Sequence, residues 1–168
     1  MFHVDTKRLP LLKGEVKSLR REYLFVGIDD YSRELYAGIY GDKSQFSSAA
    51  FLQRDVLAQV PYTIECVYSD NGREYKGTQE HAFVKLCRDN RINQKFTKPA
   101  CPQTNGKAEP VIRTLMEMWN EKKHFIDSAD RQAKLRRFLN FYNTVKPHKG
   151  LNSATPYEIL EFYFNQKV

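Results

Sequence analysis

The sequence is poor in cysteine, and its few cysteines are not arranged like metal ligands or a disulfide framework. Cys66, Cys87 and Cys101 are odd in number and form no Cys-x-x-Cys pair. This usage favours a reduced environment, so we expect a cytoplasmic protein. The histidines also lack the spacing of zinc ligands. They are His3, His81, His124 and His148.

Long hydrophobic runs are absent as well. The longest apolar run, residues 23–28, is far shorter than the roughly 20 residues that a membrane-spanning helix needs. Met1 is not followed by a charged and then apolar leader, which argues against export. We therefore expect no membrane partner.

Negative charge is in the minority. Lys and Arg number 27 against 20 Asp and Glu, which gives a formal net charge of +7 over 168 residues. A basic balance favours a polyanionic partner such as DNA. With 41% apolar and 28% charged residues, the composition is that of a soluble globular protein, and the length predicts one domain over residues 1–168.

Some apolar segments have the pattern of strands, and others have the spacing of amphipathic helices. Their order along the chain is typical of a mixed sheet flanked by helices. We expect strands over residues 2–6, 23–28, 35–40, 64–68 and 92–97, the first three as an antiparallel meander. We expect helices over residues 44–60, 79–90, 110–123 and 130–144, and a last helix from the capping box Thr155-Pro156-Tyr157-Glu158. Residues 7–22 read as a turn or a long hairpin arm. The predicted fold class is α/β, with a mixed five-stranded sheet.

Three acids are candidates for holding a divalent cation. Asp70 follows an apolar run and enters an Asn-Gly turn, so it should project from the tip of a strand. Glu109 follows a loop rich in Gly, Asn and Pro and should lie in the first turn of a helix. Asp5 lies in the first strand. Each also has an ordinary explanation. Asp70 could simply be a turn residue, Glu109 could complement the helix dipole, and Asp5 could be a solvated acid.

Four motifs carry a resemblance to a known family. They cover residues 3–7 (HVDTK), 25–33 (FVGIDDYSR), 69–75 (SDNGREY) and 102–109 (PQTNGKAE). Together they resemble the integrase catalytic core, of the DDE family, of bacterial insertion-sequence transposases, which is related to retroviral integrase. Further similarity at residues 113–115, 142–143, 146–148 and 155–156 extends the resemblance over nearly the whole chain.

The resemblance implies a ribonuclease H-like fold whose last helices, from about residue 129, extend the core at its C-terminal end. It implies that Asp5, Asp70 and Glu109 hold two Mg²⁺ or Mn²⁺ ions, with Asp5 bridging both. Two such ions about 3.5–4 Å apart activate a nucleophile and neutralise the leaving oxygen of a phosphodiester, and Mg²⁺ prefers carboxylate oxygen and water as ligands. The implied activity is cleavage of DNA at the ends of an element and strand transfer into a target, in a bacterial cytoplasm.

The sequence departs from the family pattern at two places. Between Asp70 and Glu109 lie 38 residues, a few more than is usual in the family, and we place the extra residues near Lys76 to Glu80. Pro110 stands where the family often has Arg, which removes a charge near the DNA without redirecting Glu109.

The loop before Glu109 supplies candidate DNA contacts. Gln103, Asn105 and Lys107 are polar residues beside a possible hinge at Gly106, and the matching family loop reaches the DNA end. Arg113 lies one turn beyond Glu109, at a position that is commonly basic in the family. It either faces DNA or pairs with Glu109. The sequence shows no separate recognition module, so we expect DNA binding with little preference for the element's own ends.

Other residues that suggest chemistry have structural explanations. Asp29 and Asp30 are adjacent acids, but they match the turn of the family rather than its triad. Met116, Met118 and Trp119 suit packing, not a cofactor site.

Synapsis of two DNA ends predicts a homodimer. Apolar helical residues offer a surface for it or simply complete the core; they are Leu135, Phe138, Leu139, Tyr142 and the segment 157–164. Two alternative functions remain open. One is another ribonuclease H-like nuclease, such as a ribonuclease H or junction resolvase, and the other is a non-catalytic DNA-binding remnant of a decayed element.

Overall fold

The computed structural model describes residues 1–12, 21–97 and 108–166, and a mixed sheet lies at its centre. The strands are β1 (Phe2–Arg8), β2 (Tyr23–Asp29), β3 (Leu35–Tyr40), β4 (Cys66–Ser69) and β5 (Asn93–Phe96). They lie in the order β3-β2-β1-β4-β5. β1, β2 and β3 are antiparallel neighbours, whereas β4 runs parallel to β1 and β5 parallel to β4. This confirms the predicted mixed five-stranded sheet and its meander.

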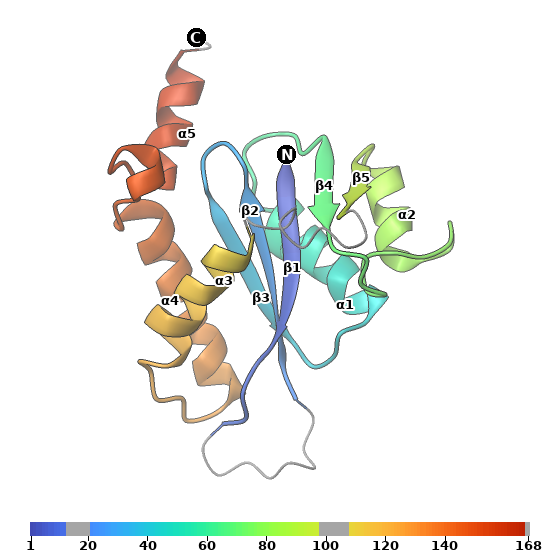
Figure 1. Ribbon diagram of the computed structural model, residues 1–168, viewed down its shortest axis with the longest axis horizontal. Helices are drawn as coiled ribbons and strands as arrows, with labels where there is room; N and C mark the ends of the chain where they lie inside the picture. Colours follow the sequence, from blue (N-terminus) through green and yellow to red (C-terminus); the bar gives the residue numbers. More distant parts are fainter. Residues whose placement is uncertain (13–20, 98–107, 167–168) are drawn as a thin grey trace.

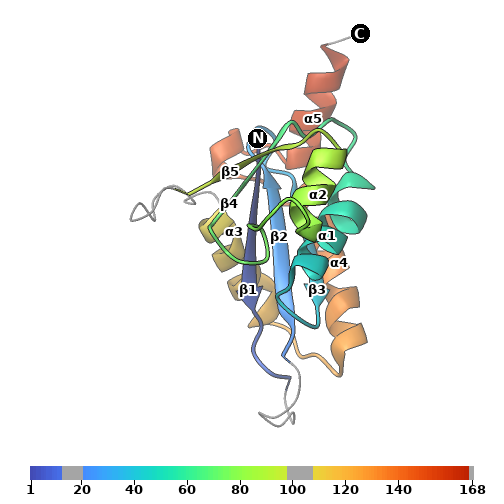
Figure 2. The same cartoon turned by 90° about the vertical axis from the view of Figure 1, so that its right-hand side faces the viewer.

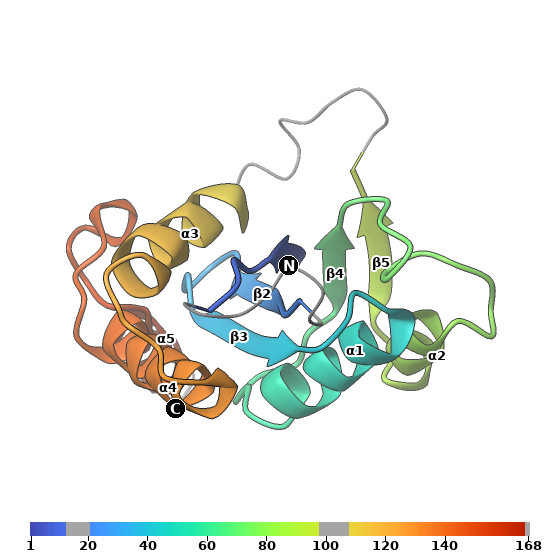
Figure 3. The same cartoon turned by 90° about the horizontal axis from the view of Figure 1, so that it is seen from below.

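Helices cover both faces of this sheet. They are α1 (Gln45–Ala50), which continues as the π-helical η1 (Phe51–Leu57), α2 (Ala82–Asp89), α3 (Ala108–Leu115), which continues as the π-helical η3 (Met116–Asn120), α4 (Ser128–Thr144), the short η4 (Lys149–Leu151) and α5 (Pro156–Asn165). Figures 1 and 3 show α1 and α2 on one face and α3 and α4 on the other. α5 extends beyond the sheet at the C-terminal end (Figure 2).

Local capping explains where several helices begin. The Ser44 side chain accepts the Ser47 N–H at the start of α1, and Thr155 and Glu158 form the predicted capping box of α5. By contrast, α2 begins only at Ala82, three residues later than predicted. The Ala82 N–H donates to Gln45 Oε1 of α1 at 2.6 Å, so a neighbouring helix supplies this contact.

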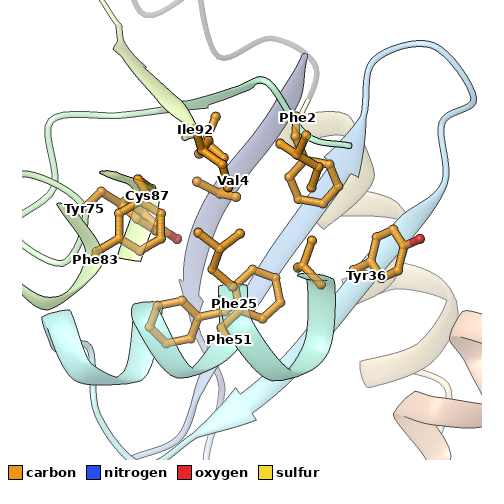
Figure 4. Close-up of a cluster of buried hydrophobic side chains, with 13 residues drawn as sticks. Phe2, Val4, Phe25, Tyr36, Phe51, Tyr75, Phe83, Cys87 and Ile92 are labelled. Carbon is orange, nitrogen blue, oxygen red and sulfur yellow. The ribbon is translucent and has the colours of Figure 1, made fainter. Parts of the chain in front are cut away.

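The residues of β2 alternate between two apolar cores. Phe25 points into the first, between the sheet and α1 and α2, where it contacts the rings of Phe51 and Tyr75 (Figure 4). Leu24 and Val26 point into the second, between the sheet and α3 and α4. Burial on both faces confirms the prediction from this continuous apolar run.

The structure decides between the two explanations that the sequence left open for the apolar residues of α4. Leu135, Phe138 and Tyr142 are 0%, 9% and 4% exposed and belong to the second core, so they do not form a subunit surface. Trp119 is fully buried in the same core, which confirms its packing role. The large exposed apolar side chains of this region lie mainly on α5, at Tyr157, Phe162 and Phe164.

Arg131 joins α4 to the segments that flank residues 13–20. Its guanidinium is 2% exposed, donates to Glu22 Oε2 at 3.0 Å and donates to the Pro10 carbonyl at 2.9 Å. It also lies 5.1 Å from the centre of the Phe125 ring. One buried cation thus connects three parts of the chain that are distant in sequence.

We predict that Arg131→Met lowers the free energy of unfolding by about 2–4 kcal/mol, because it leaves Glu22 and the Pro10 carbonyl without their donor. Urea denaturation measures this change. Lys134→Met is the matched control, since Lys134 lies one turn away and pairs with Asp130 at the surface. Equal losses in the two variants would contradict the role of Arg131.

Candidate active site

Asp5 lies in the middle of β1, on the sheet face that α3 covers. Val4 points into the first core, so its neighbour Asp5 points to the opposite face, and Asp5 pairs with Val26, which belongs to the second core. The carboxylate is partly buried, and Asp5 Oδ1 accepts the Thr6 N–H at 2.7 Å.

Asp70 directly follows β4, the parallel neighbour of β1. The register pairs Phe2 with Val67 and His3 with Tyr68. Continued by two residues, this register brings Asp70 level with Asp5. The parallel pairing therefore places side by side two acids that are far apart in sequence.

A network of hydrogen bonds holds the turn after Asp70. The Gly72 N–H donates to Asp70 Oδ1 at 2.9 Å, and the Asn71 amide donates to the Thr97 carbonyl at 2.9 Å. The hydroxyl groups of Tyr75 and Thr6 are 2.6 Å apart, which ties the turn to β1 next to Asp5. The Asp70 backbone is thus anchored to β1 and to the end of β5.

Glu109 lies in the first turn of α3, as the sequence predicts. Its side chain is exposed, whereas the preceding Ala108 is fully buried. α3 packs against β1 and β2, which places its first turn on the same sheet face as Asp5.

The Asp5 carboxylate is affected by its burial and by the two other acids. The pKa of Asp5 is raised to about 6, first by burial and then by the negative charges of Asp70 and Glu109. Lys43 opposes this rise, as does the hydrogen bond from Thr6. Within the described residues, no group of three His, Cys, Asp or Glu side chains is gathered tightly enough to hold a metal ion. The acids thus share one region without forming a preassembled ligand cluster.

Sequence reasoning missed an ion pair beside these acids. Lys43 Nζ lies 2.9 Å from Glu74 Oε1, and the Glu74 side chain is only 3% exposed. Burial lowers the pKa of Lys43, but Glu74 and, after it, Asp70 and Asp5 together outweigh this effect, so the net shift of the pKa is upward. Glu74 lies within the 69–75 motif, so its position in the sequence could have indicated a place near the acids. Lys43 lies between β3 and α1, and only the tertiary structure brings it here.

Gly72 is required by the close approach of two carboxylates. A Cβ at this position would lie 2.5 Å from Glu74 Oε2 and 2.8 Å from Asp70 Oδ1. A side chain would therefore displace one acid or the other.

The predicted DNA contacts fall into two groups. Gln103, Asn105 and Lys107 lie outside the described residues. Arg113 is exposed on α3, and the ion pairs of the described residues do not include one with Glu109.

Asp29 and Asp30 have the structural roles expected of them. Asp29 Oδ2 accepts the Tyr31 N–H and both the N–H and the hydroxyl of Ser32, which closes the turn after β2. Asp30 pairs with Arg33 at 3.3 Å.

The sheet order and the placement of the acids define a ribonuclease H-like α/β protein with an acidic centre, and solved structures share this fold. The catalytic core domain of BIV integrase superposes with a TM-score of 0.69 at 21% identity, over 99% of this chain and 97% of that one. A chain of the simian T-cell lymphotropic virus intasome, in complex with the PP2A regulatory subunit B56 gamma, gives a TM-score of 0.72 at 15% identity, over 94% of this chain and 52% of that one.

Sequence comparisons identify the family. A family model described as an integrase core domain matches residues 2–102, and a second model with the same description matches residues 90–156. The chain therefore belongs to the integrase core domain family, which confirms the resemblance seen in its motifs.

Two relatives have similar sequences. The chain is 25% identical over 176 residues to ORF3 of Spiroplasma virus SpV1-C74, whose name describes an integrase, and this match covers 93% of the chain. It is 27% identical over 141 residues to a protein of insertion element IS136 from Agrobacterium fabrum, covering 79% of the chain. The chain spans 49% of the length of the first relative and 70% of the second.

Within residues 1–12, 21–97 and 108–166, no helix is both long enough and apolar enough to span a bilayer.

We predict that Asp5→Asn stabilises the metal-free protein above pH 6. Asp5 has a pKa of about 6 when folded and an ordinary value of 3.8. Between these two pH values the folded state keeps a proton that the unfolded chain has released. The free energy of unfolding therefore falls as the pH rises from about 4 to about 6. Asn carries no such penalty, so in EDTA at pH 8 the variant should gain about 3 kcal/mol, with no gain below about pH 4.

Urea denaturation at several pH values tests this prediction, with the exposed Asp89→Asn as the control. An Asp5→Asn variant no more stable than the parent at pH 8 would show that Asp5 ionises without cost.

We also predict that Lys43→Met lowers the free energy of unfolding by about 1–2 kcal/mol, because it leaves the buried Glu74 carboxylate without its cation. The double variant Lys43→Met/Glu74→Gln should recover part of this loss, since the remaining group is neutral. Chemical denaturation of both variants is the measurement. A double variant that is less stable than the single variant would contradict the claim that Lys43 stabilises the protein through the Glu74 carboxylate.

Proposed function

We propose that this chain is the catalytic core of a DDE transposase or integrase that cleaves DNA at the ends of an element and joins them to a target. The observation that carries the proposal is the arrangement of the acids on a ribonuclease H-like fold. The β1–β4 register sets Asp5 level with Asp70, and α3 carries Glu109 in its first turn over the same sheet face. Membership of the integrase core domain family supports it. In this proposal residues 1–168 form one core, with α4 and α5 as its C-terminal extension.

The acidic centre fits Mg²⁺ or Mn²⁺ in its chemistry. Its donors are carboxylate oxygens, and Asp5 carries a raised pKa that a nearby cation would relieve. In the proposed site the carboxylates of Asp5, Asp70 and Glu109 would hold two such ions. When bound, the ions would supply activation of a water or a 3′-hydroxyl and neutralisation of the leaving oxygen.

The protein's own residues position these groups. The register between β1 and β4 sets Asp5 beside Asp70, and the Gly72 N–H orients the Asp70 carboxylate. Glu109 is carried by a separate helix, so its approach depends on how α3 packs on β1 and β2. Lys43 adds a positive charge that offsets part of the repulsion between the acids.

The proposed partner is DNA, both element ends and target. We assign Gln103, Asn105, Lys107 and Arg113 to contacts with it, in keeping with the net charge of +7. We further propose that the active assembly contains a homodimer, since two DNA ends must be processed together. The exposed apolar side chains of α5 are the surface that we assign to subunit contact.

A strand-transfer assay with a preprocessed DNA end tests the proposal. Asp5→Asn, Asp70→Asn and Glu109→Gln should each lower product formation by at least about 100-fold in Mg²⁺ or Mn²⁺, because each removes a charged oxygen ligand. Asp89→Asn, an exposed acid on α2, is the control and should retain activity.

The outcomes distinguish the alternatives. Cleavage of an RNA–DNA hybrid without strand transfer would favour a ribonuclease H-type nuclease. An inert parent protein that still binds DNA would favour a non-catalytic remnant. Calorimetry with Mn²⁺ adds an independent readout, because the triad variants should lose binding whereas Asp89→Asn should not.

A further inference from the structure

A basic cavity adjoins the first turn of α3. Its volume is about 540 Å³, and it lies between α3, the turn after β2 and the connection from α4 to η4. Its lining includes Arg33, Lys146 and Lys149, and the described residues that line it include no Asp or Glu.

The cavity is organised around Tyr142. Lys146 Nζ lies 5.7 Å from the centre of the Tyr142 ring, and the His148 ring lies 4.4 Å from it in an edge-to-face arrangement. His148 Nε2 is 3.0 Å from the Tyr142 carbonyl oxygen, and burial lowers the pKa of His148. The His148 ring is therefore neutral near pH 7, and its contacts with Tyr142 hold the connection from α4 to η4 in place. The positive charge of the cavity comes from Lys146, Lys149 and Arg33.

Arg33 is presented to the cavity by a constrained turn. Its φ is 64°, and its N–H donates to the Asp29 carbonyl at 3.1 Å. Asp30 offsets part of its charge through the ion pair at 3.3 Å. No ion pair within residues 1–12, 21–97 and 108–166 involves Lys146 or Lys149, so these two ammonium groups supply most of the net charge.

The position of the cavity relates it to the acidic centre. Pro110 and Val111, which directly follow Glu109, form one of its walls. Successive phosphates along one strand of duplex DNA lie about 3.4 Å apart along the helix axis. A strand that passes Glu109 in the direction of Pro110 and Val111 would therefore bring its next phosphates to this wall.

We propose that the cavity lined by Arg33, Lys146 and Lys149 binds a backbone phosphate of the DNA strand that passes Glu109. This proposal rests on the proposed function and adds a phosphate contact beside the first turn of α3. The recognition is of charge and not of base sequence, because ammonium and guanidinium groups contact phosphate oxygens of any nucleotide.

Fluorescence anisotropy with a labelled duplex in EDTA tests the proposal without involving metal. Lys146→Gln and Lys149→Gln should each weaken binding on every duplex. The double variant, which loses the whole contact to one phosphate, should reduce the slope of log affinity against log salt by about 1. Lys85→Gln, an exposed lysine on α2, is the matched control and should leave the slope unchanged.

A second experiment locates the phosphate. Single neutral methylphosphonate linkages are placed along the strand, and one position should weaken binding of the parent protein but not of the double variant. Thermal denaturation of each variant confirms that it folds. Unchanged salt slopes in well-folded variants, or methylphosphonate effects that are the same in parent and double variant, would overturn the proposal.

The two proposals fail in different ways. If the slopes are unchanged but strand transfer proceeds, the cavity proposal is wrong and the proposed function stands. If the slopes fall as expected but the acid variants cut DNA like the parent, the catalytic assignment is wrong and the phosphate site stands. A parent protein that binds no DNA overturns both.

Discussion

The parallel pairing of β1 with β4 is the constraint on which the rest of the site depends. It aligns Phe2 with Val67 and His3 with Tyr68, and the next residues along both strands bring Asp5 level with Asp70. Parallel neighbours require a crossover, and here the crossover contains the meander and α1. The aromatic core between the sheet and α1 therefore supports the acidic centre, because it holds that crossover against the sheet.

Gathering acids in this way has an electrostatic cost. Burial and two neighbouring carboxylates raise the pKa of Asp5, while Lys43 and the N–H groups of Thr6 and Gly72 offset part of the repulsion. Lys43 is itself held by the buried Glu74. In the proposed function this balance limits the repulsion between the acids in the region where a cation would bind.

Much of the fold was predictable because its signals are local. The continuous apolar run of β2 predicts a strand buried on both faces, and Ser44 and the Thr155 capping box predict where α1 and α5 begin. Errors arose where distant segments decide. The N-terminal end of α2 depends on Gln45, and Leu135 was an ambiguous apolar residue until its contacts showed that it belongs to the core.

The sequence by itself determined the family, the order of the elements and the identity of the three candidate acids, because motif residues and their order are properties of the chain alone. Only the tertiary structure decided what surrounds them. It brought Lys43 to Asp5 and Asp70, and it assembled Arg33, Lys146 and Lys149 around Tyr142. Charges separated by dozens or more than a hundred residues interact only through the fold, since Coulomb energy depends on distance in space and on burial.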